Sequence, residues 1–209
     1  MTRADMVRIL KPYGVDASPQ LCSAVHAYMD LLIKWNKKVS LTSMTRPEEI
    51  VGRHFGESFF ALHGMPLRLH RLVDVGSGAG FPGLALKLLL PEVDVTLVES
   101  NTKKAAFLAE VILRLRLDRV KVLCTRTEEM ELPEPIADCV TARAIGRFAE
   151  LLKWSARALE PGGKIVLWLG AEDAARVAQS PDWSWSEPIA IPNSTRRVLL
   201  AGSPWRRPI

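Results

Sequence analysis

The sequence lacks the features that mark several classes of protein. No apolar run approaches the roughly 20 residues of a membrane-spanning helix, and the N-terminal residues include no apolar core of a signal peptide. A Gly-Lys-Ser/Thr motif is absent, which argues against a nucleoside triphosphate site of the P-loop type. The four histidines and three cysteines show no metal-ligand spacing. We therefore expect no membrane segment and no metal.

Cysteine is scarce, and charge of neither sign is in large excess. Cys22, Cys124 and Cys139 are far apart, and the last two fall in expected strands, so we predict buried thiols in a reducing cytoplasm. The net charge of +5 permits a nucleic-acid partner without requiring one. The 209 residues suffice for one core. We expect a helical extension over 1–60 and an α/β domain over 61–209, together one compact domain and a monomer.

What the sequence does contain is a glycine-rich turn between an apolar strand and a helix. Residues 72–83 read LVDVGSGAGFPG, with Asp74 near the end of the apolar run. A second strand, 93–98, ends in Glu99, about 20 residues beyond the first glycine, where such folds place a carboxylate on ribose hydroxyls. Glycines at alternate positions let the backbone approach a ligand closely; they are Gly76, Gly78 and Gly80. The pattern predicts a nucleoside-cofactor site.

The spacing of the glycines bears on the kind of cofactor. A dinucleotide fold favours Gly-x-Gly-x-x-Gly, with the pyrophosphate at a helix N-terminus, whereas this loop reads Gly-x-Gly-x-Gly. Asp74 would repel a pyrophosphate but suits the ammonium and sulfonium of S-adenosylmethionine. The glycines could simply form a turn. The combination of strand, acid, glycines, helix and second acid nevertheless favours a cofactor site, and a methyl donor over a dinucleotide.

Alternating strands and helices follow this motif. The pattern predicts an α/β fold with a doubly wound, mostly parallel, seven-stranded sheet and an antiparallel pair at its edge. We expect residues 171–187 to form a loop-rich insertion. The further expected strands are 120–124, 137–141, 164–169, 188–191 and 197–201, and the expected helices are 84–90, 103–115 and 148–159.

The N-terminal residues are expected to form three helices that carry basic and polar side chains. A helix that starts at Ser18-Pro19 ends in the basic and aromatic segment 34–38, KWNKK. This segment is either a solvated helix end with Trp35 packed beneath it or a contact for RNA phosphates and a base. The third helix carries Arg53, His54, Glu57 and Ser58, which could face the cofactor cleft. An ordinary interface role for this histidine is the favoured alternative.

The residues after the fourth strand restrict the chemistry. They read Thr-Ala-Arg-Ala over 141–144, not the Asn/Asp-Pro-Pro-Tyr/Phe of exocyclic-amine methylation. Cys139 lacks the basic neighbours of a nucleophilic thiolate. Guanine N7 has a free lone pair and needs no base, so proximity and alignment would suffice. Arg143 could hydrogen-bond a guanine or a phosphate there; the alternative is a salt bridge with Glu99 or Glu128.

Several stretches together resemble the glucose-inhibited division protein B family, RsmG/GidB. They are LLIKWNKKVSLTS at 31–43, LVDVGSGAGFPG at 72–83, TLVESNTKKAAFL at 96–108, RTEE at 126–129 and TARA at 141–144. The resemblance covers most of the chain. It implies a cytoplasmic enzyme with a Rossmann-like methyltransferase domain that uses S-adenosyl-L-methionine to form 7-methylguanosine in 16S ribosomal RNA of the small subunit.

The resemblance also implies roles for individual residues. Family positions that touch the methyl donor match Gly76, Phe81, Thr127, Glu128 and Arg143. With the residues singled out above, the expected cofactor contacts are Asp74, Gly76, Gly78, Gly80, Phe81, Glu99, Thr127, Glu128 and Arg143, the last also as the catalytic residue. The expected RNA contacts are Lys34, Lys37, Lys38, Arg53 and His54.

The chain departs from the family pattern after two strands. Leu169 stands where the family usually has lysine, and Ala142 and Ile145 replace a serine and a phenylalanine; Arg147 is an alternative source of charge. The first change favours a second hypothesis, a small-molecule methyltransferase of the same fold. A cofactor-binding ribosome assembly factor is a third hypothesis, and a dinucleotide oxidoreductase a distant fourth.

Overall fold

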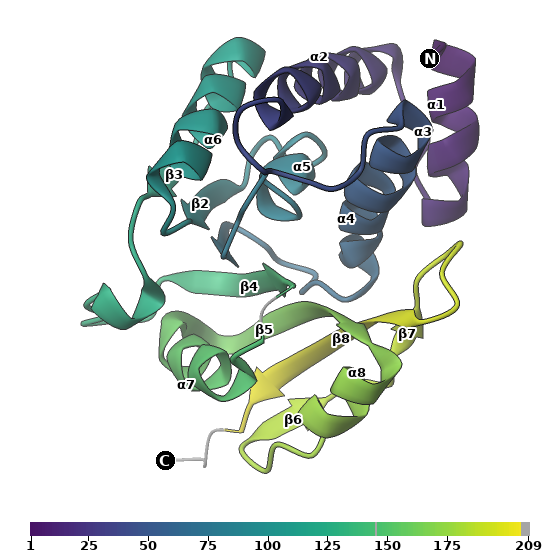
Figure 1. Cartoon of the computed structure of the whole chain (residues 1–209). Helices are drawn as coiled ribbons and strands as arrows, with labels where there is room; N and C mark the ends of the chain where they lie inside the picture. The colour runs from purple at the N-terminus through teal and green to yellow at the C-terminus, as the bar shows by residue number, and fades with distance from the viewer. Residues whose placement is uncertain (145, 206–209) are drawn as a thin grey trace.

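A mixed β-sheet organises the computed structural model, which describes residues 1–144 and 146–205 (Figure 1). The strand order is β3-β2-β1-β4-β5-β8-β6, and β7 pairs with β8. The first five strands are parallel, and β8 runs antiparallel to its neighbours. The strands are β1 (Arg71–Val75), β2 (Asp94–Val98), β3 (Val120–Leu123), β4 (Ala137–Arg143), β5 (Leu159–Gly170), β6 (Trp183–Trp185), β7 (Ile189–Ala190) and β8 (Arg197–Pro204).

The predicted doubly wound, mostly parallel sheet with an antiparallel edge is confirmed, although the sheet has eight strands instead of seven. The strand order runs in opposite directions on the two sides of the β1–β4 pair. Ligands of open α/β sheets bind beyond the carboxyl ends of the strands at such a switch point. The topology therefore predicts a ligand site at the loops that follow β1, β2, β3 and β4.

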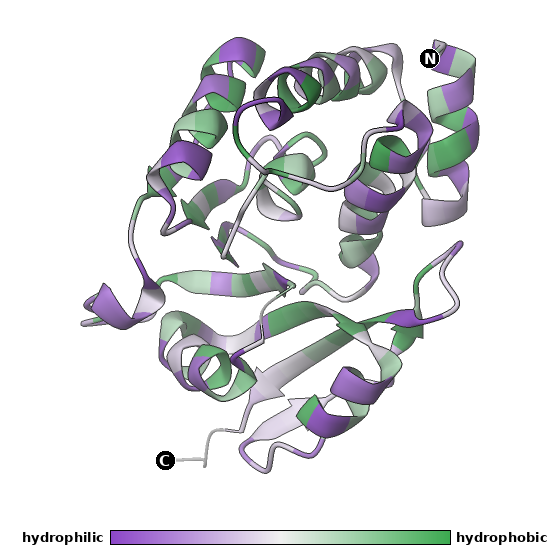
Figure 2. Ribbon diagram, viewed as in Figure 1, coloured by the Kyte–Doolittle hydropathy of each residue, from purple (hydrophilic) through white to green (hydrophobic). Residues whose placement is uncertain are grey.

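Helices cover both faces of the sheet (Figure 1). Alternate side chains of β1 enter different cores: Leu72 packs with the N-terminal helices, and Val73 packs beneath α7 and α8. Figure 2 shows both polar and apolar residues along α6, which has one buried and one solvated face. The helices are α1 (Arg3–Leu10), α2 (Pro19–Asn36), α3 (Pro47–Glu49), α4 (Glu57–Phe59), α5 (Gly83–Lys87), α6 (Thr102–Leu115), α7 (Phe148–Ala158) and α8 (Ala171–Val177).

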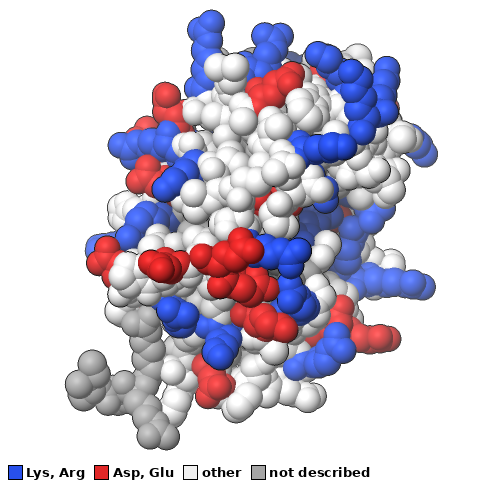
Figure 3. Space-filling model, turned by 60° about the vertical axis from the view of Figure 1, so that its left-hand side comes forward, with Lys and Arg blue, Asp and Glu red and all other residues white. Residues whose placement is uncertain are grey.

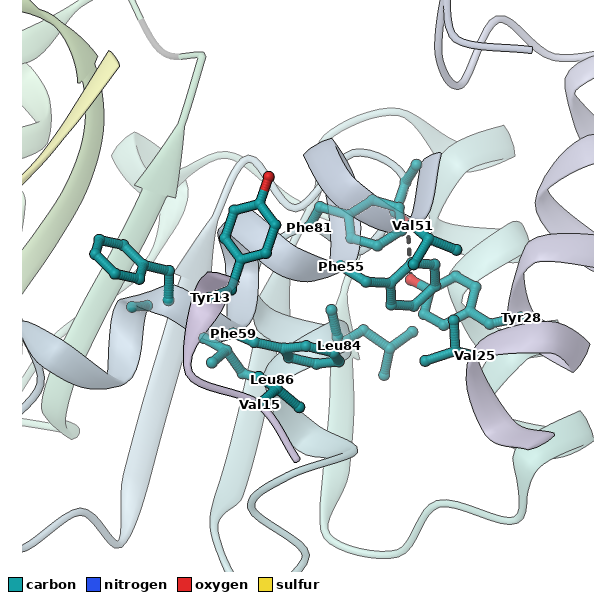
Figure 4. Packing of buried hydrophobic residues seen from close by; sticks show 14 of the residues in the cluster. Tyr13, Val15, Val25, Tyr28, Val51, Phe55, Phe59, Phe81, Leu84 and Leu86 are labelled. Carbon is teal, nitrogen blue, oxygen red and sulfur yellow. Dashed lines mark hydrogen bonds between the residues drawn. The ribbon is translucent and has the colours of Figure 1, made fainter. Parts of the chain in front are cut away.

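The N-terminal helices form a layer that rests on the glycine loop. Ser18 caps α2, since its Oγ accepts a hydrogen bond from the Leu21 N–H at 3.1 Å, and Pro19 occupies the first turn as predicted. Farther along α2, the Tyr28 hydroxyl donates to the Ala79 carbonyl at 2.7 Å (Figure 4). The predicted third helix is a continuous helical stretch in which α3 is followed by the π-helical segment η2 (Ile50–Gly56), by α4 and by the 3₁₀ turn η3 (Phe60–His63).

Two local predictions were wrong. Residues 171–187 are not mainly loop, because they contain α8 and β6; Val177 and Trp183 are buried in the core beneath the sheet. Cys124 was predicted to be buried but lies one residue beyond β3 and is exposed, whereas Cys139 is buried as predicted; Cys22 is buried as well. Within the described residues, no group of three His, Cys, Asp or Glu side chains is placed to hold a metal ion. Among the helices of those residues, none is long and apolar enough to cross a membrane.

Candidate functional site

A pocket of about 300 Å³ opens at the carboxyl ends of β1, β2 and β3. Three of the predicted cofactor residues, Gly76, Thr127 and Glu128, line it. The remaining lining residues come from the strand ends and from the start of α7; they are Val75, Val98, Ser100, Thr125, Arg126, Arg147, Glu150 and Leu151. The pocket therefore lies beside the switch point, between the glycine loop and the segment after β3.

Arg147 forms part of the wall opposite the glycine loop. Its guanidinium pairs with the Glu128 carboxylate at 2.9 Å, and both side chains are largely exposed. From the sequence, Arg147 was predicted only as an alternative source of charge. Glu150, one helical turn farther along, also lines the pocket and was not predicted as a site residue. The signal that could have found them is their place in the first turn of the helix after β4, because that helix start faces the switch point in this topology.

Gly78 is held against Glu99 and leaves open space on its other side. Its N–H donates to Glu99 Oε2 at 2.8 Å, and Glu99 Oε1 accepts from the Asn101 N–H at 2.7 Å. Gly78 has a φ of +57°. In the part of the chain that the structure describes, the only non-adjacent heavy atom within 4 Å of a Cβ built there is the Gly76 carbonyl oxygen, at 3.7 Å. A close approach of a ligand to this backbone is therefore sterically possible.

Gly80 has a different environment, although it is only two residues away. A Cβ at Gly80 would overlap the Tyr28 hydroxyl, and its φ is +84°. The packing of Tyr28 under the loop is thus sufficient to explain a glycine at this position. Alternate glycines in one loop therefore serve different purposes, one leaving space for a ligand and the other making room for a neighbouring helix.

Asp74 lies beneath the loop and does not line the pocket. Its side chain is fully buried, and Oδ1 accepts a hydrogen bond from the Thr141 hydroxyl at 2.8 Å. A Cβ at Gly83 would overlap Asp74, so this carboxylate fixes the start of α5 close to β1. Burial raises the pKa of Asp74 to about 6, and hydrogen bonds from Thr141 and Ser77 oppose that rise.

Phe81 and His54 belong to a stack of rings between the helical layer and the glycine loop. The Phe81 ring is stacked on His54 at 4.5 Å between centroids. It is also stacked on Tyr28, at 5.3 Å between centroids (Figure 4). His54 Nε2 is 2.8 Å from the Thr42 hydroxyl. Burial lowers the pKa of His54 to about 3, and the positive charges of Arg143 and Arg53 act in the same direction. His54 is therefore a neutral ring within the interface.

The low pKa of His54 predicts a pH-dependent contribution to stability. The folded-state pKa lies below the ordinary 6.5, so the unfolded chain binds the proton first as pH falls. This contribution is fully present above pH 6.5 and is lost toward pH 3, at up to about 1.4 kcal/mol per pH unit. We expect the stability advantage of wild type over His54→Gln to shrink between pH 7 and pH 4.5. Urea unfolding at the two pH values measures it.

Asp74 contributes to stability with the opposite pH dependence. Because its folded-state pKa is raised to about 6, its contribution to stability is present below pH 3.8 and is lost as pH rises through 6. The two groups partly cancel in wild type, so the comparison of His54→Gln with wild type is needed to separate them. An unchanged difference between the two proteins at both pH values would contradict a neutral His54 in the ring stack.

Arg143 joins the end of β4 to the N-terminal helices. Its Nη1 donates to the Arg53 carbonyl at 2.9 Å, and its Nη2 pairs with Glu57 Oε2 at 3.0 Å. Glu57 is 1% exposed, and its Oε1 also pairs with Arg197 Nη2 at 2.7 Å. The Trp168 indole N–H donates to the Glu57 carbonyl at 2.9 Å. The alternative prediction, a salt bridge of Arg143 with Glu99 or Glu128, was wrong, because Arg143 pairs with Glu57.

The predicted RNA contacts do not all lie on one exposed surface. Lys34, Lys37 and Lys38 are exposed at the end of α2, but His54 is half-buried in the ring stack. Trp35 is not available as a flat platform for a base. It lies 5.7 Å from Phe107 in an edge arrangement and donates to the Glu110 carboxylate at 2.8 Å. The alternative in which Trp35 packs beneath the helix end is therefore confirmed.

The sheet order, the glycine loop and the pocket at the switch point define a Rossmann-like methyltransferase fold. A methyltransferase from Aquifex aeolicus, described as SAM-dependent, has a similar structure with a TM-score of 0.59 at 14% identity, over 75% of this chain and 93% of that one. The YcgJ protein of Bacillus subtilis gives a TM-score of 0.60 at 12% identity, over 74% of this chain and all of that chain. At these identities the similarity establishes the fold alone.

The chain belongs to the GidB family, described as rRNA small subunit methyltransferase G, which matches residues 21–190. Proteins named ribosomal RNA small subunit methyltransferase G are similar to it. The Myxococcus xanthus protein is 42% identical over 79% of each chain, and a Neisseria meningitidis protein is 34% identical over 87% of this chain and 86% of its own. A Desulfitobacterium hafniense relative is 42% identical over 73% of this chain, a match that spans 64% of that protein. The resemblance drawn from the sequence is confirmed.

Proposed function

We propose that this protein transfers a methyl group from S-adenosyl-L-methionine to N7 of a guanine in small-subunit ribosomal RNA. The observation that carries the proposal is the pocket at the switch point, lined by Gly76, Thr127 and Glu128, in a chain of the GidB family. The names of the relatives supply the substrate class. Methyl transfer from labelled donor to small subunits that lack the modification tests the proposal. The chain would act in the cytoplasm as a monomer.

The residues present fit the methyl donor. Its nucleoside would occupy the pocket near Ser100, Thr127 and Glu128, with Glu99 beside the ribose. Its amino acid part would pass along the backbone at Gly76 and Gly78, where a Cβ built on the second glycine meets open space. Buried Asp74 places a negative charge beneath this loop, which suits a cationic ligand. When bound, the donor supplies an electrophilic methyl group.

Methylation at N7 fits the chemistry available in this chain. The lone pair of N7 attacks without a general base, so the protein must mainly align the guanine with the donor. The one cysteine in β4, Cys139, is fully buried, and burial raises the pKa of its thiol, which argues against covalent attack on a pyrimidine. Arg143, beside the switch point, is the residue that we assign to orienting the guanine or its phosphate.

The basic end of α2 is the surface that we assign to ribosomal RNA. Figure 3 shows Lys and Arg side chains along the upper part of one face, above a group of Asp and Glu side chains. Lys34, Lys37 and Lys38 extend from exposed positions of the helical layer. Arg53 lies in the same layer, paired with Glu49 at 2.9 Å and still 45% exposed. Together these cations would contact phosphates rather than bases.

Reversal of charge at Lys37 and Lys38 should weaken binding to the small subunit and flatten its salt dependence. Each lost phosphate contact reduces the magnitude of the negative slope of log K against log salt by roughly 0.7 to 0.9. Filter binding at several salt concentrations measures this slope. Lys153→Glu is a matched control, because Lys153 is an exposed lysine on α7, a helix on the other face of the sheet. An unchanged slope in the double variant would make the two lysines ordinary solvated surface.

The departures from the family pattern give little support to a small-molecule substrate. Leu169 is 6% exposed and packs in the same core as Ala174 and Val177 of α8, so the position of the missing lysine is not on the pocket wall. Ile145 lies outside the described residues. Donor binding without transfer to RNA would favour an assembly factor, and tight binding of a nicotinamide dinucleotide would favour an oxidoreductase.

A further inference from the structure

A second pocket of about 250 Å³ lies at the basic end of α2, apart from the cofactor pocket. Its walls are the last turns of α2, the loop that follows, and the start of η2. Half of the lining side chains are apolar. The lining residues are Leu32, Ile33, Asn36, Lys37, Thr42, Met44, Thr45 and Ile50. The proposed methyl-donor site shares none of them.

Hydrogen bonds hold the wall of this pocket in place. The Asn36 side chain donates to the Thr42 carbonyl at 2.8 Å and accepts from the N–H groups of Leu41 and Thr42 at 2.9 and 3.0 Å. The Thr42 hydroxyl in turn accepts from the Met44 N–H at 3.1 Å. Because the loop is already ordered by these bonds, a ligand would enter without first paying to order it.

Cations predominate around the pocket, and Glu49, the chain neighbour of the lining residue Ile50, is paired with Arg53. Lys37 contributes to the lining, and Lys34, Lys38 and Arg46 are exposed neighbours of lining residues in the chain. No carboxylate is among the lining residues. The apolar part of the cavity could hold a flat ring, and the cations beside it could bind phosphates. That combination matches an unpaired nucleotide and not an apolar peptide.

We propose that this pocket receives an unpaired nucleobase of the substrate RNA, while Lys37 and its basic neighbours hold the adjoining phosphates. The proposal rests on the proposed function and adds a second point of attachment beyond the methylated guanine. Trp35, the nearest aromatic side chain in the basic segment, is engaged with Phe107 and Glu110, so the aliphatic pocket takes the role of a base-binding surface.

The position of the pocket gives this attachment a link to the glycine loop. Thr42 lines the pocket and is hydrogen-bonded to His54 at 2.8 Å, and His54 is stacked on Phe81 of the glycine loop. A base seated against Thr42 is thus separated from the loop by only two side chains. RNA anchored here would lie on the helical layer that Arg143 joins to the end of β4.

The Thr45→Trp variant tests the pocket by filling it from an exposed wall position. Stacking or insertion of one base contributes roughly 10- to 100-fold in affinity. We expect Thr45→Trp to weaken binding of the small-subunit RNA by that factor with an unchanged salt slope, and Thr45→Ala to bind as wild type. Lys37→Gln should instead reduce the slope. The donor affinity should be unchanged in the threonine variants.

Photo-cross-linking of wild type to RNA containing 4-thiouridine supplies an independent readout. Cross-links to the loop that contains Met44 support the pocket, and Thr45→Trp should remove them. Wild-type affinity in Thr45→Trp, or cross-links confined to other segments, would overturn the inference while leaving the methyltransferase proposal intact. Absence of methyl transfer and of RNA binding in wild type would overturn the proposed function, and the inference with it.

Discussion

Gly78→Val is expected to leave the protein folded and to abolish binding of the methyl donor. Among the described residues, a Cβ at Gly78 meets no side chain within 4 Å, because its nearest neighbour is the Gly76 carbonyl oxygen at 3.7 Å. The branched side chain therefore extends into the space assigned to the donor. The φ of +57° adds a backbone strain of about 1–3 kcal/mol, which a stable domain tolerates. Calorimetric titration should show a donor affinity weaker by roughly 100-fold or more, about 2.8 kcal/mol.

Gly80→Ala is the matched control for this experiment. Its smaller side chain would overlap the Tyr28 hydroxyl and disturb the hydrogen bond to the Ala79 carbonyl, so we expect a loss of stability of roughly 3 kcal/mol. Urea unfolding compares the two variants. Donor affinity within a few-fold of wild type in Gly78→Val would contradict the cofactor site, and an undisturbed stability of Gly80→Ala would contradict the packing beneath the loop.

Arg143→Ala is expected to lower the rate of methyl transfer far more than donor affinity. Arg143 lies at the end of β4, outside the lining of the donor pocket, so its removal should misalign the guanine and not the donor. Loss of one such oriented donor of hydrogen bonds typically lowers turnover by roughly 10²- to 10³-fold. Single-turnover transfer to small subunits gives the rate, and calorimetry gives the donor affinity.

The position of Arg143 requires a control for stability. Its removal leaves the buried Glu57 with Arg197 as its remaining charged partner, and breaking a buried pair costs about 3–5 kcal/mol when no partner replaces the lost one. Arg143→Lys keeps the positive charge but cannot reach both the Arg53 carbonyl and Glu57 in the same geometry. A large loss of donor affinity with unchanged turnover would place Arg143 in the donor site.

The elements around the cofactor site could be predicted because their signals are local. An apolar run, closely spaced glycines and a second run ending in an acid indicate adjacent parallel strands, and the structure pairs Val75 with Val98 at those ends. Gly76, which this pattern singled out, lines the pocket, and so do Thr127 and Glu128, which the family resemblance implied. Short elements were less predictable. The three residues of β6 and the seven of α8 are too few to establish a clear periodicity.

The contacts between distant segments could not be derived from the sequence. Glu57 meets Arg143 and Arg197 only because β4 ends and β8 begins beside the N-terminal helices, and nothing near these residues in the chain indicates the pairing. The role of Gly80 depends on Tyr28 from α2 in the same way. Asp74 was expected to face the donor, but the packing of α5 on β1 encloses it. Tertiary packing, not local pattern, decides these positions.

Methyl transfer to intact small subunits is the decisive measurement of the proposed activity. Labelled S-adenosyl-L-methionine would be supplied with small subunits lacking the modification, whole ribosomes or stripped RNA, and borohydride and aniline cleavage would locate 7-methylguanosine. The account predicts label at one guanine of the small-subunit RNA, lost in Gly78→Val and strongly reduced in Arg143→Ala. No transfer to any of the three substrates, with donor binding intact, would contradict it.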